Sequence, residues 1–170
     1  MEPEVSNADF QKRQPGFTDS PCELFIFPLR QTLEFRKNGE TIHTYTISTS
    51  RFGLGSEEGS FKTPTGNFVI AEKFGNGAPL FASFKSRLFT GEIAAPGGEE
   101  DLILTRILWL NGVDENNANT YSRYVYIHGT NQEHLLGTPA SHGCIRMRNQ
   151  DIAELYDQIP EGTPVKIETV

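Results

Sequence analysis

Cysteine is scarce in this chain of 170 residues, which contains only Cys22 and Cys144. Two thiols form at most one disulfide, so the fold does not rest on a disulfide framework like those of small secreted domains. A bridge between the two would also block a nucleophilic thiol. We therefore expect both cysteines as thiols, with Cys22 packed at an edge or in the core.

Long hydrophobic runs and an excess of basic residues are also missing. No apolar stretch approaches the roughly 20 residues that a membrane-spanning helix needs, so we expect no membrane span. The 15 Lys and Arg are outnumbered by 22 Asp and Glu, which gives a net charge of −7. Because nucleic acids and anionic lipids are bound mainly through clustered basic side chains, we expect neither as a partner. A local basic pocket for a small anion is still compatible with this charge.

The first 20 residues contain no signal-peptide-like hydrophobic segment, and residues 1–21 are polar and aperiodic. We predict a flexible N-terminal tail over residues 1–22 and one domain over residues 23–170, long enough for a sizeable core. Two locations fit this start: the cytoplasm if Met1 is the natural start, or the periplasm or another extracytoplasmic compartment if a signal peptide has been removed. We expect a monomer.

Alternating apolar and polar residues predict a mainly β fold. Residues 23–37 and 41–49 are predicted to form a hairpin around Asn38-Gly39, the strongest short turn signal. Thr63-Pro64-Thr65-Gly66 has the residues of a type I turn. Further strands are predicted over residues 67–72, 102–110, 124–128 and 164–168.

Two segments depart from this pattern. Residues 74–101 are rich in glycine and proline and are expected to be a long excursion with short strands inside it. Such a segment is either a functional lid or binding wall, or an irregular surface insertion. After the second cysteine one short helix is predicted, with Asn149 as its N-cap and Pro160 beyond its end. Its apolar residues recur at helical spacing: Ile152, Leu155, Tyr156 and Ile159.

The segment Ser141-His142-Gly143-Cys144 places a thiol directly behind a glycine. A glycine permits a tight turn that aims the N–H groups of Gly143 and Cys144 into one pocket, as an oxyanion hole requires. The helix start that follows is expected to lower the pKa of the thiol. These neighbours favour a nucleophilic Cys144 over the common alternative, a buried structural cysteine.

A histidine at the end of a predicted strand supplies the candidate base. His128 comes from a different element than Cys144, and the following Gly129 opens space at the strand end. The alternative is a structural histidine bonded to a backbone carbonyl. We expect His142 to shape the pocket or to hold His128, and His134 to be a solvated surface residue.

Zinc is the competing interpretation, because His128, His134, His142 and Cys144 all carry zinc-binding atoms. Structural zinc sites favour two close pairs of ligands, and only His142 and Cys144 are close here. We therefore predict no metal. Arg146 places a guanidinium near the thiol, where it would suit a substrate carboxylate. The alternative is a solvated arginine in a salt bridge.

These motifs resemble the catalytic domain of the L,D-transpeptidases, the YkuD-type family. The resemblance rests on His128 near a strand end and on Ser141-His142-Gly143-Cys144, and it extends from about residue 23 to residue 167. Residues 47–49, 63–66 and 161–165 are further landmarks. It implies a bacterial protein with a β-sandwich-like fold, one short helix, and neither a metal nor an organic cofactor. Catalysis would fall to Cys144, His128, His142 and Gly143, and substrate binding to Ser141, Arg146 and Gly129.

The resemblance also implies a reaction on peptidoglycan stem tetrapeptides or muropeptides. Cys144 would attack the L-centre carbonyl of a diaminopimelate–D-Ala bond and release D-Ala, with His128 moving the proton. An amine of a second stem would complete transpeptidation, whereas water would complete an L,D-carboxypeptidase reaction on soluble muropeptides. Two alternatives belong to other classes, an inactive peptidoglycan-binding module and a zinc-binding structural domain.

Overall fold

The computed structural model describes residues 21–169, and strands dominate them. The strands are β1 (Cys22–Phe27), β2 (Thr32–Lys37), β3 (Glu40–Ser48), β4 (Gly66–Phe74), β5 (Ala82–Lys85), β6 (Leu88–Ile93), β7 (Ile103–Gly112), β8 (Tyr126–Gly129), β9 (Ile145–Met147) and β10 (Pro164–Ile167). They form one sheet in the order β4-β10-β1-β2-β3-β9-β8-β7-β5-β6. Because β4 also pairs with β7, the first eight strands of that order close into a ring. The predicted mainly β fold is confirmed. The two layers expected of a β-sandwich-like fold are parts of one continuous sheet.

The chain starts with a three-stranded antiparallel meander. Asn38-Gly39 joins β2 to β3 as predicted, with both residues at positive φ (54° and 81°), the type I′ geometry. The prediction of one unbroken arm over residues 23–37 is wrong. A turn after Phe27 separates β1 from β2, and the Arg30 N–H donates to Phe27 O there.

The predicted tail ends one residue earlier than expected. Cys22 already belongs to β1, where it is buried, and it forms no disulfide with Cys144. Residues 1–20, the greater part of that tail, lie outside the described residues. The predicted turn over residues 63–66 is also absent: Thr63 forms a bridge with Leu54, and Gly66 begins β4.

One α-helix lies within residues 21–169: α2 (Asn149–Gln158), with three short 3-10 segments η1 (Glu115–Asn117), η2 (Tyr121–Arg123) and η3 (Glu133–Leu135). It packs against β7 and β8 and buries Ile152, Leu155 and Tyr156, so the predicted helix is confirmed. None of the helices in the described part of the chain is both long and apolar enough to cross a bilayer.

Asn149 does not cap this helix, contrary to the prediction. Arg148 holds the N-cap position, and Asn149 is the first helical residue. Its side chain turns toward the sheet, where Nδ2 donates to Thr130 O at 2.7 Å and Oδ1 accepts from Thr105 Oγ1 at 2.5 Å. The Asn149 N–H instead donates to the carboxylate of Glu133 at 2.9 Å. Tertiary partners thus take the amide away from its usual capping bond.

The strands β7 and β8 are buried on both faces. Alternate residues of β7 divide between two apolar clusters: Leu108 and Leu110 join the main core of the ring and α2, while Ile107 and Trp109 join a second, smaller cluster. Tyr126 of β8 belongs to that second cluster, and Cys144 packs against it. The thiol therefore lies on the face of β8 that points away from the main core.

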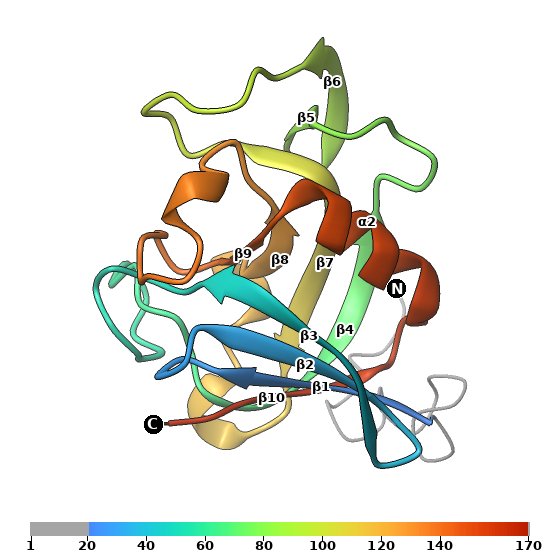
Figure 1. The fold of residues 1–170 in the computed structure, drawn as a ribbon. Helices are drawn as coiled ribbons and strands as arrows, with labels where there is room; N and C mark the ends of the chain where they lie inside the picture. The colour runs from blue at the N-terminus through green and yellow to red at the C-terminus, as the bar shows by residue number, and fades with distance from the viewer. Residues whose placement is uncertain (1–20, 170) are drawn as a thin grey trace, which may run out of the picture.

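Residues 74–101 form the predicted excursion, with β5 and β6 as its short strands. The two strands make a hairpin that continues the sheet through the pairing of β5 with the start of β7. In Figure 1 this hairpin stands at the end of the molecule opposite β1 and β10. Every residue of β6 is exposed. A role for the segment as a moving lid stays a prediction.

Candidate active site

The parallel pairing of β8 with β9 brings the two key residues together. His128 is in register with Arg146, and Ile127 with Ile145, so Cys144 lies beside Tyr126 just before β9. Side chains two residues apart along a strand share a face. The imidazole of His128 and the thiol of Cys144 therefore lie on the same face, one strand apart, as the motif predicted.

The sulfur of Cys144 is held between two backbone groups of the neighbouring segment. Sγ accepts a hydrogen bond from the Tyr126 N–H at 3.4 Å and donates one to Tyr124 O at 3.5 Å. Burial raises the pKa of Cys144 to about 12. The expected lowering of this pKa by the helix start is wrong, because α2 begins at Asn149 and its first N–H binds Glu133. The side chain of Cys144 is therefore a neutral thiol.

His128 is oriented through one ring nitrogen and keeps the other available. Its Nδ1–H donates to Gly129 O at 2.6 Å, which leaves the lone pair on Nε2 in the neutral ring. Burial lowers the pKa of His128, although the negative charge of Asp101 opposes this shift. The carbonyl contact expected of a structural histidine is thus present, and it is compatible with a base at Nε2.

The turn before the thiol is fixed from several sides. Gly143 has a φ of +123°, a conformation that favours glycine, and a Cβ there would lie 3.4 Å from Lys62 O. Ser141 Oγ donates to Cys144 O at 2.6 Å and accepts the Gly143 N–H at 3.3 Å. Thr63 Oγ1 donates to Gly143 O at 3.0 Å. Ser141 is fully buried, so it pins the turn, and the predicted role in substrate binding does not fit.

Arg146 is buried and makes its internal contacts through one nitrogen, Nη1, whereas Nε and Nη2 have no hydrogen-bond partner among the described residues. Its side chain is 0% exposed, and Nη1 donates to Asp101 Oδ1 at 3.0 Å and to Gln132 Oε1 at 2.9 Å. Burial opposes ionisation of Asp101, but the charges of His128 and Arg146 outweigh it and lower the pKa of this carboxyl. The prediction that Arg146 binds a substrate carboxylate does not fit a guanidinium enclosed in this way.

His142 and Gly129 complete the surroundings of the base. The half-exposed His142 pairs through Nδ1 with Asp101 Oδ2 at 3.2 Å, so it reaches His128 only through this shared carboxylate. A Cβ on Gly129 would lie 2.5 Å from Asn149 Oδ1 and 2.7 Å from Leu104 O. Only glycine fits there. Gly129 is buried and supplies the carbonyl that orients His128, so its predicted role in substrate binding does not fit.

The thiol opens into a cavity of about 210 Å³. Its lining residues are Glu58, Gly59, Phe61, Arg123, Tyr124, Val125, His142, Gly143 and Cys144. The rings of two lining residues, Phe61 and His142, pack with that of Phe52, with centroids 5.9 to 6.1 Å apart. The cavity therefore combines a thiol, an aromatic wall and the cation of Arg123.

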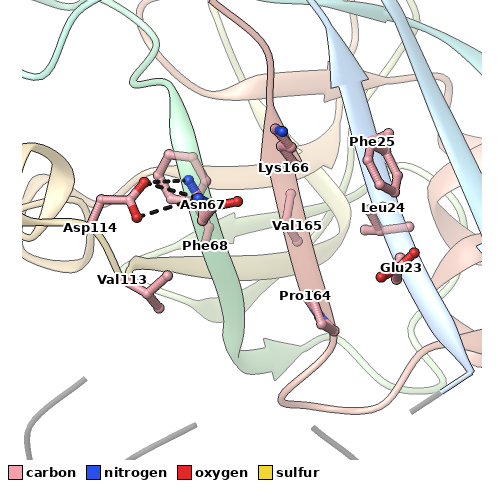
Figure 2. A pocket seen from close by; sticks show the side chains of 10 residues that line it. All are labelled: Glu23, Leu24, Phe25, Asn67, Phe68, Val113, Asp114, Pro164, Val165 and Lys166. Atoms are coloured by element: carbon pink, nitrogen blue, oxygen red, sulfur yellow. Dashed lines mark hydrogen bonds between the residues drawn. The ribbon is translucent and has the colours of Figure 1, made fainter. Parts of the chain in front are cut away.

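A second cavity, of about 340 Å³, lies over β4, β10 and β1 (Figure 2). Figure 2 shows the side chains of Lys166, Phe25 and Glu23 along the strands and the contact between Asn67 and Asp114 at one side. None of its lining residues is a cysteine or a histidine. The chemistry predicted from the sequence therefore belongs to the thiol cavity.

Sequence reasoning missed three residues of the site: Asp101, Arg123 and Tyr126. Strand alternation could have placed Tyr126 on the face of His128, because the two are separated by one residue. Asp101 and Arg123 lie outside the strands, where no periodicity marks them. No group of three or more His, Cys, Asp or Glu within residues 21–169 is arranged to hold a metal ion, and His134 is exposed in η3.

Comparison with known proteins identifies the family. Residues 24–167 match the model of the family YkuD, described as the L,D-transpeptidase catalytic domain. The chain belongs to this family. The resemblance predicted from the motifs is thus confirmed over nearly the same range, and the chain joins a family of enzymes.

Individual relatives agree with this assignment. YkuD of Bacillus subtilis (strain 168), assigned as an L,D-transpeptidase, is 26% identical over 156 residues, 90% of this chain and 71% of YkuD. YbiS of Escherichia coli (strain K12), assigned likewise, is 41% identical over 56 residues, 31% of this chain and 18% of YbiS. A solved structure of L,D-transpeptidase 3 from Mycobacterium tuberculosis, with a faropenem-derived adduct, shares the fold. Its TM-score is 0.56 at 18% identity, over 88% of this chain and 60% of that one. The chain thus spans only part of several relatives.

Proposed function

We propose that this domain is a cysteine-dependent L,D-transpeptidase that acts on peptidoglycan stem tetrapeptides through a thioester on Cys144. One observation carries the proposal: the Gly129 carbonyl engages Nδ1 of His128, which leaves Nε2 as a base on the face of the sheet that holds the thiol. Membership of the L,D-transpeptidase family supports the same reaction class.

The first step follows from the two protonation states. A neutral thiol and a neutral imidazole favour proton transfer to Nε2 as the sulfur attacks, over a preformed ion pair. The S–C bond forms at the L-centre carbonyl of the diaminopimelate–D-Ala bond, and Asp101 stabilises the imidazolium. The N–H groups of Cys144 and Gly143 are the candidate oxyanion donors, with the Gly143 N–H exchanging its long bond to Ser141 Oγ for the oxyanion.

Collapse of this intermediate breaks the C–N bond. The imidazolium of His128 gives its proton to the departing amine of D-Ala, and the tripeptide acyl group stays on Cys144 as a thioester. The amine of a second stem then attacks the thioester, its proton passes to His128, and the imidazolium returns that proton to the departing sulfur, which restores the neutral thiol and the neutral imidazole. This sequence is balanced without a metal or an organic cofactor.

A second candidate differs only in the acceptor. The mouth of the cavity is partly open, with Phe61 55% and Tyr124 56% exposed, so water also reaches the sulfur. Hydrolysis of the thioester would make the domain an L,D-carboxypeptidase that trims soluble muropeptides. An inactive peptidoglycan-binding module would need neither the His128 orientation nor the thiol, so the geometry does not favour it.

The test is incubation with a disaccharide-tetrapeptide, with and without an amine acceptor, followed by mass analysis of the products. A cross-linked or amine-exchanged product is expected from the wild type, and none from Cys144→Ala. Tripeptide alone would replace the transpeptidase proposal by the carboxypeptidase. Cys22→Ala is the matched control and should keep full activity. Unchanged turnover in Cys144→Ala would refute the thioester mechanism.

A carbapenem provides an independent probe of the nucleophile. We expect a covalent adduct on the peptide that contains Cys144, because a β-lactam carbonyl offers the same electrophile to the same sulfur. An adduct confined to Cys22 would contradict the assignment.

A further inference from the structure

One more arginine, Arg87, lies next to the aromatic residues around the thiol, outside the lining of the thiol cavity. Arg146 is enclosed beneath the thiol, and Arg123 is the cation that lines the thiol cavity. Arg87, at the tip of the β5–β6 hairpin, places its guanidinium against the aromatic residues that surround Cys144. Nothing in the local sequence of the hairpin indicates this approach, because β5 and β8 are separated in the sheet by β7.

The backbone at this tip is held in an unusual conformation. Ser86 and Arg87 connect β5 to β6 as a two-residue turn, with φ values of 48° and 64°. Such turns favour Asn-Gly, because most other residues are strained at positive φ. Non-glycine residues with this geometry cluster at ligand sites, where surrounding contacts hold them. Here the conformation directs a long cationic side chain back toward β8.

The guanidinium is fixed by the residues that also hold the sulfur. Arg87 Nη1 donates to Tyr126 Oη at 3.1 Å, and its Cζ lies 4.6 Å from the ring centroid of Trp109 and 5.6 Å from that of Tyr124. Tyr126 and Tyr124 supply the N–H and the carbonyl that contact Cys144 Sγ. The cation therefore lies at the hydroxyl end of Tyr126, and the sulfur lies at the backbone end of the same residue.

No carboxylate neutralises this cation in the described part of the chain. None of the ion pairs within residues 21–169 uses Arg87, in a protein whose acidic residues outnumber its basic ones. The hydrogen bond with Tyr126 raises the pKa of Arg87, so the guanidinium is fully charged. A guanidinium has five N–H donors in a planar fork that matches a carboxylate. Most of these donors are available to a ligand.

The geometry points to Arg87, supported by Tyr126 and the ring of Trp109, as a subsite for a carboxylate of the acyl donor. This inference rests on the proposed function, which supplies a donor with two such groups near the scissile bond. One is the terminal carboxylate of the departing D-Ala, and the other is the side-chain carboxylate of diaminopimelate. The subsite would hold one of them while the carbonyl faces Cys144.

The test compares free and amidated donors in wild type and Arg87→Gln. With the free tetrapeptide we expect Arg87→Gln to raise KM about 10-fold to 100-fold, the range for losing a charge-assisted pair, with a smaller effect on kcat. A donor amidated at the recognised carboxylate should have the high KM in both enzymes. Arg87→Lys should recover part of the loss, because it keeps the charge without the fork.

The two amidated donors identify the source of the carboxylate. If Arg87→Gln no longer distinguishes the terminal amide from the free donor, the subsite binds the carboxylate of the departing D-Ala. If it no longer distinguishes the side-chain amide from the free donor, the subsite binds the carboxylate of diaminopimelate. Lys85→Gln, which removes an exposed charge from the same hairpin, is the matched control and should behave as wild type. If Arg87→Gln distinguishes both amides from the free donor as sharply as wild type does, the subsite is refuted.

Binding can be followed without turnover. Trp109 is the single tryptophan of the chain, so its fluorescence reports on the subsite without background. A Cys144→Ala protein titrated with the tetrapeptide should change its emission, and adding Arg87→Gln should weaken the apparent affinity at least 10-fold. A thermal melt of Arg87→Gln that matches wild type excludes misfolding as the cause. If the wild type turns over no stem peptide, the proposed function fails. If Cys144→Ala binds the tetrapeptide equally well with and without Arg87→Gln, the subsite itself is overturned.

Discussion

Around the thiol, two regions differ in burial and in how completely their polar groups are paired. The floor, residues 126–129 and 141–147, is mostly buried, and Ser141, Thr63 and Gly129 bond its turn and its base to fixed neighbours. The rim, residues 51–62 and 82–93, is largely exposed and presents aromatic rings and an unneutralised arginine. Under the proposed function, the floor would fix the geometry of the thiol and of His128, and the rim would select the ligand that reaches them.

Replacing the base should give the largest effect. In His128→Gln the amide can still bond Gly129 O but cannot accept the thiol proton, so we expect kcat/KM to fall about 1,000-fold. Steady-state kinetics measure this, and circular dichroism checks that the floor is intact. A loss of less than tenfold would mean that another group deprotonates Cys144.

Alanine substitutions at two glycines, one in the floor and one in the rim, test whether the two regions differ in their effect on activity. Gly143→Ala and Gly91→Ala both force a side chain to positive φ (+123° and +88°), at a cost of about 1 to 2 kcal/mol each. A Cβ added to Gly91 would meet no atom within 4 Å, whereas one added to Gly143 would face two backbone carbonyls. Only Gly143→Ala should displace reacting groups and lose about 100-fold in kcat.

Chemical denaturation and kinetics on both variants provide the comparison. Equal activity in the two proteins would show that the position of the Gly143 turn does not matter for the reaction.

The buried ion pair predicts linked changes in stability and pH dependence. Asp101→Asn leaves Arg146 buried without a counter-charge, which should lower the free energy of unfolding by about 3 kcal/mol. It also removes the charge that raises the pKa of His128, so the acid limb of kcat/KM should move to lower pH. Glu92→Gln on exposed β6 should change neither quantity. An acid limb that moves to higher pH would contradict the placement of Asp101 beside His128.

The smallest expected effect is on stability at mildly acidic pH. Burial lowers the pKa of His128 in the folded protein below its ordinary value of 6.5. Between these two pKa values the unfolded chain binds a proton that the native protein does not, so stability should fall as the pH drops below 6.5. His128→Gln should lose this slope in urea unfolding curves measured from pH 7 to pH 5. If the pH dependence of stability is unchanged in His128→Gln, it arises from other titratable groups.

Sequence patterns predicted the elements whose structure depends mainly on interactions between residues close together in the chain. The turn at Asn38-Gly39, the helix around Ile152 and Leu155, and the origin of Cys144 and His128 in different elements all followed from spacing and residue type. The break after Phe27 was hidden because the apolar run continues across it. Asn149 failed as a cap because Thr105 and Thr130, distant in sequence, bind its amide more fully.

The environment of the site needed the tertiary structure. The burial of Arg146 and its pairing with Asp101 depend on the loop before β7, and the approach of Arg87 depends on a hairpin joined to the sheet through β7. Neither leaves a periodic signal in the sequence. The residues of the floor were therefore predictable from a motif, whereas the charge arrangement around them was not.

The most direct test of the central claim is intact-protein mass spectrometry of the enzyme quenched during turnover of a tetrapeptide donor. The proposed mechanism predicts a tripeptide acyl group on the peptide containing Cys144 in wild type and in Lys85→Gln, and strongly reduced acylation in His128→Gln at the same time point. Turnover without such an adduct, or an adduct on Cys22, would contradict a thioester formed by Cys144 with His128 as its base.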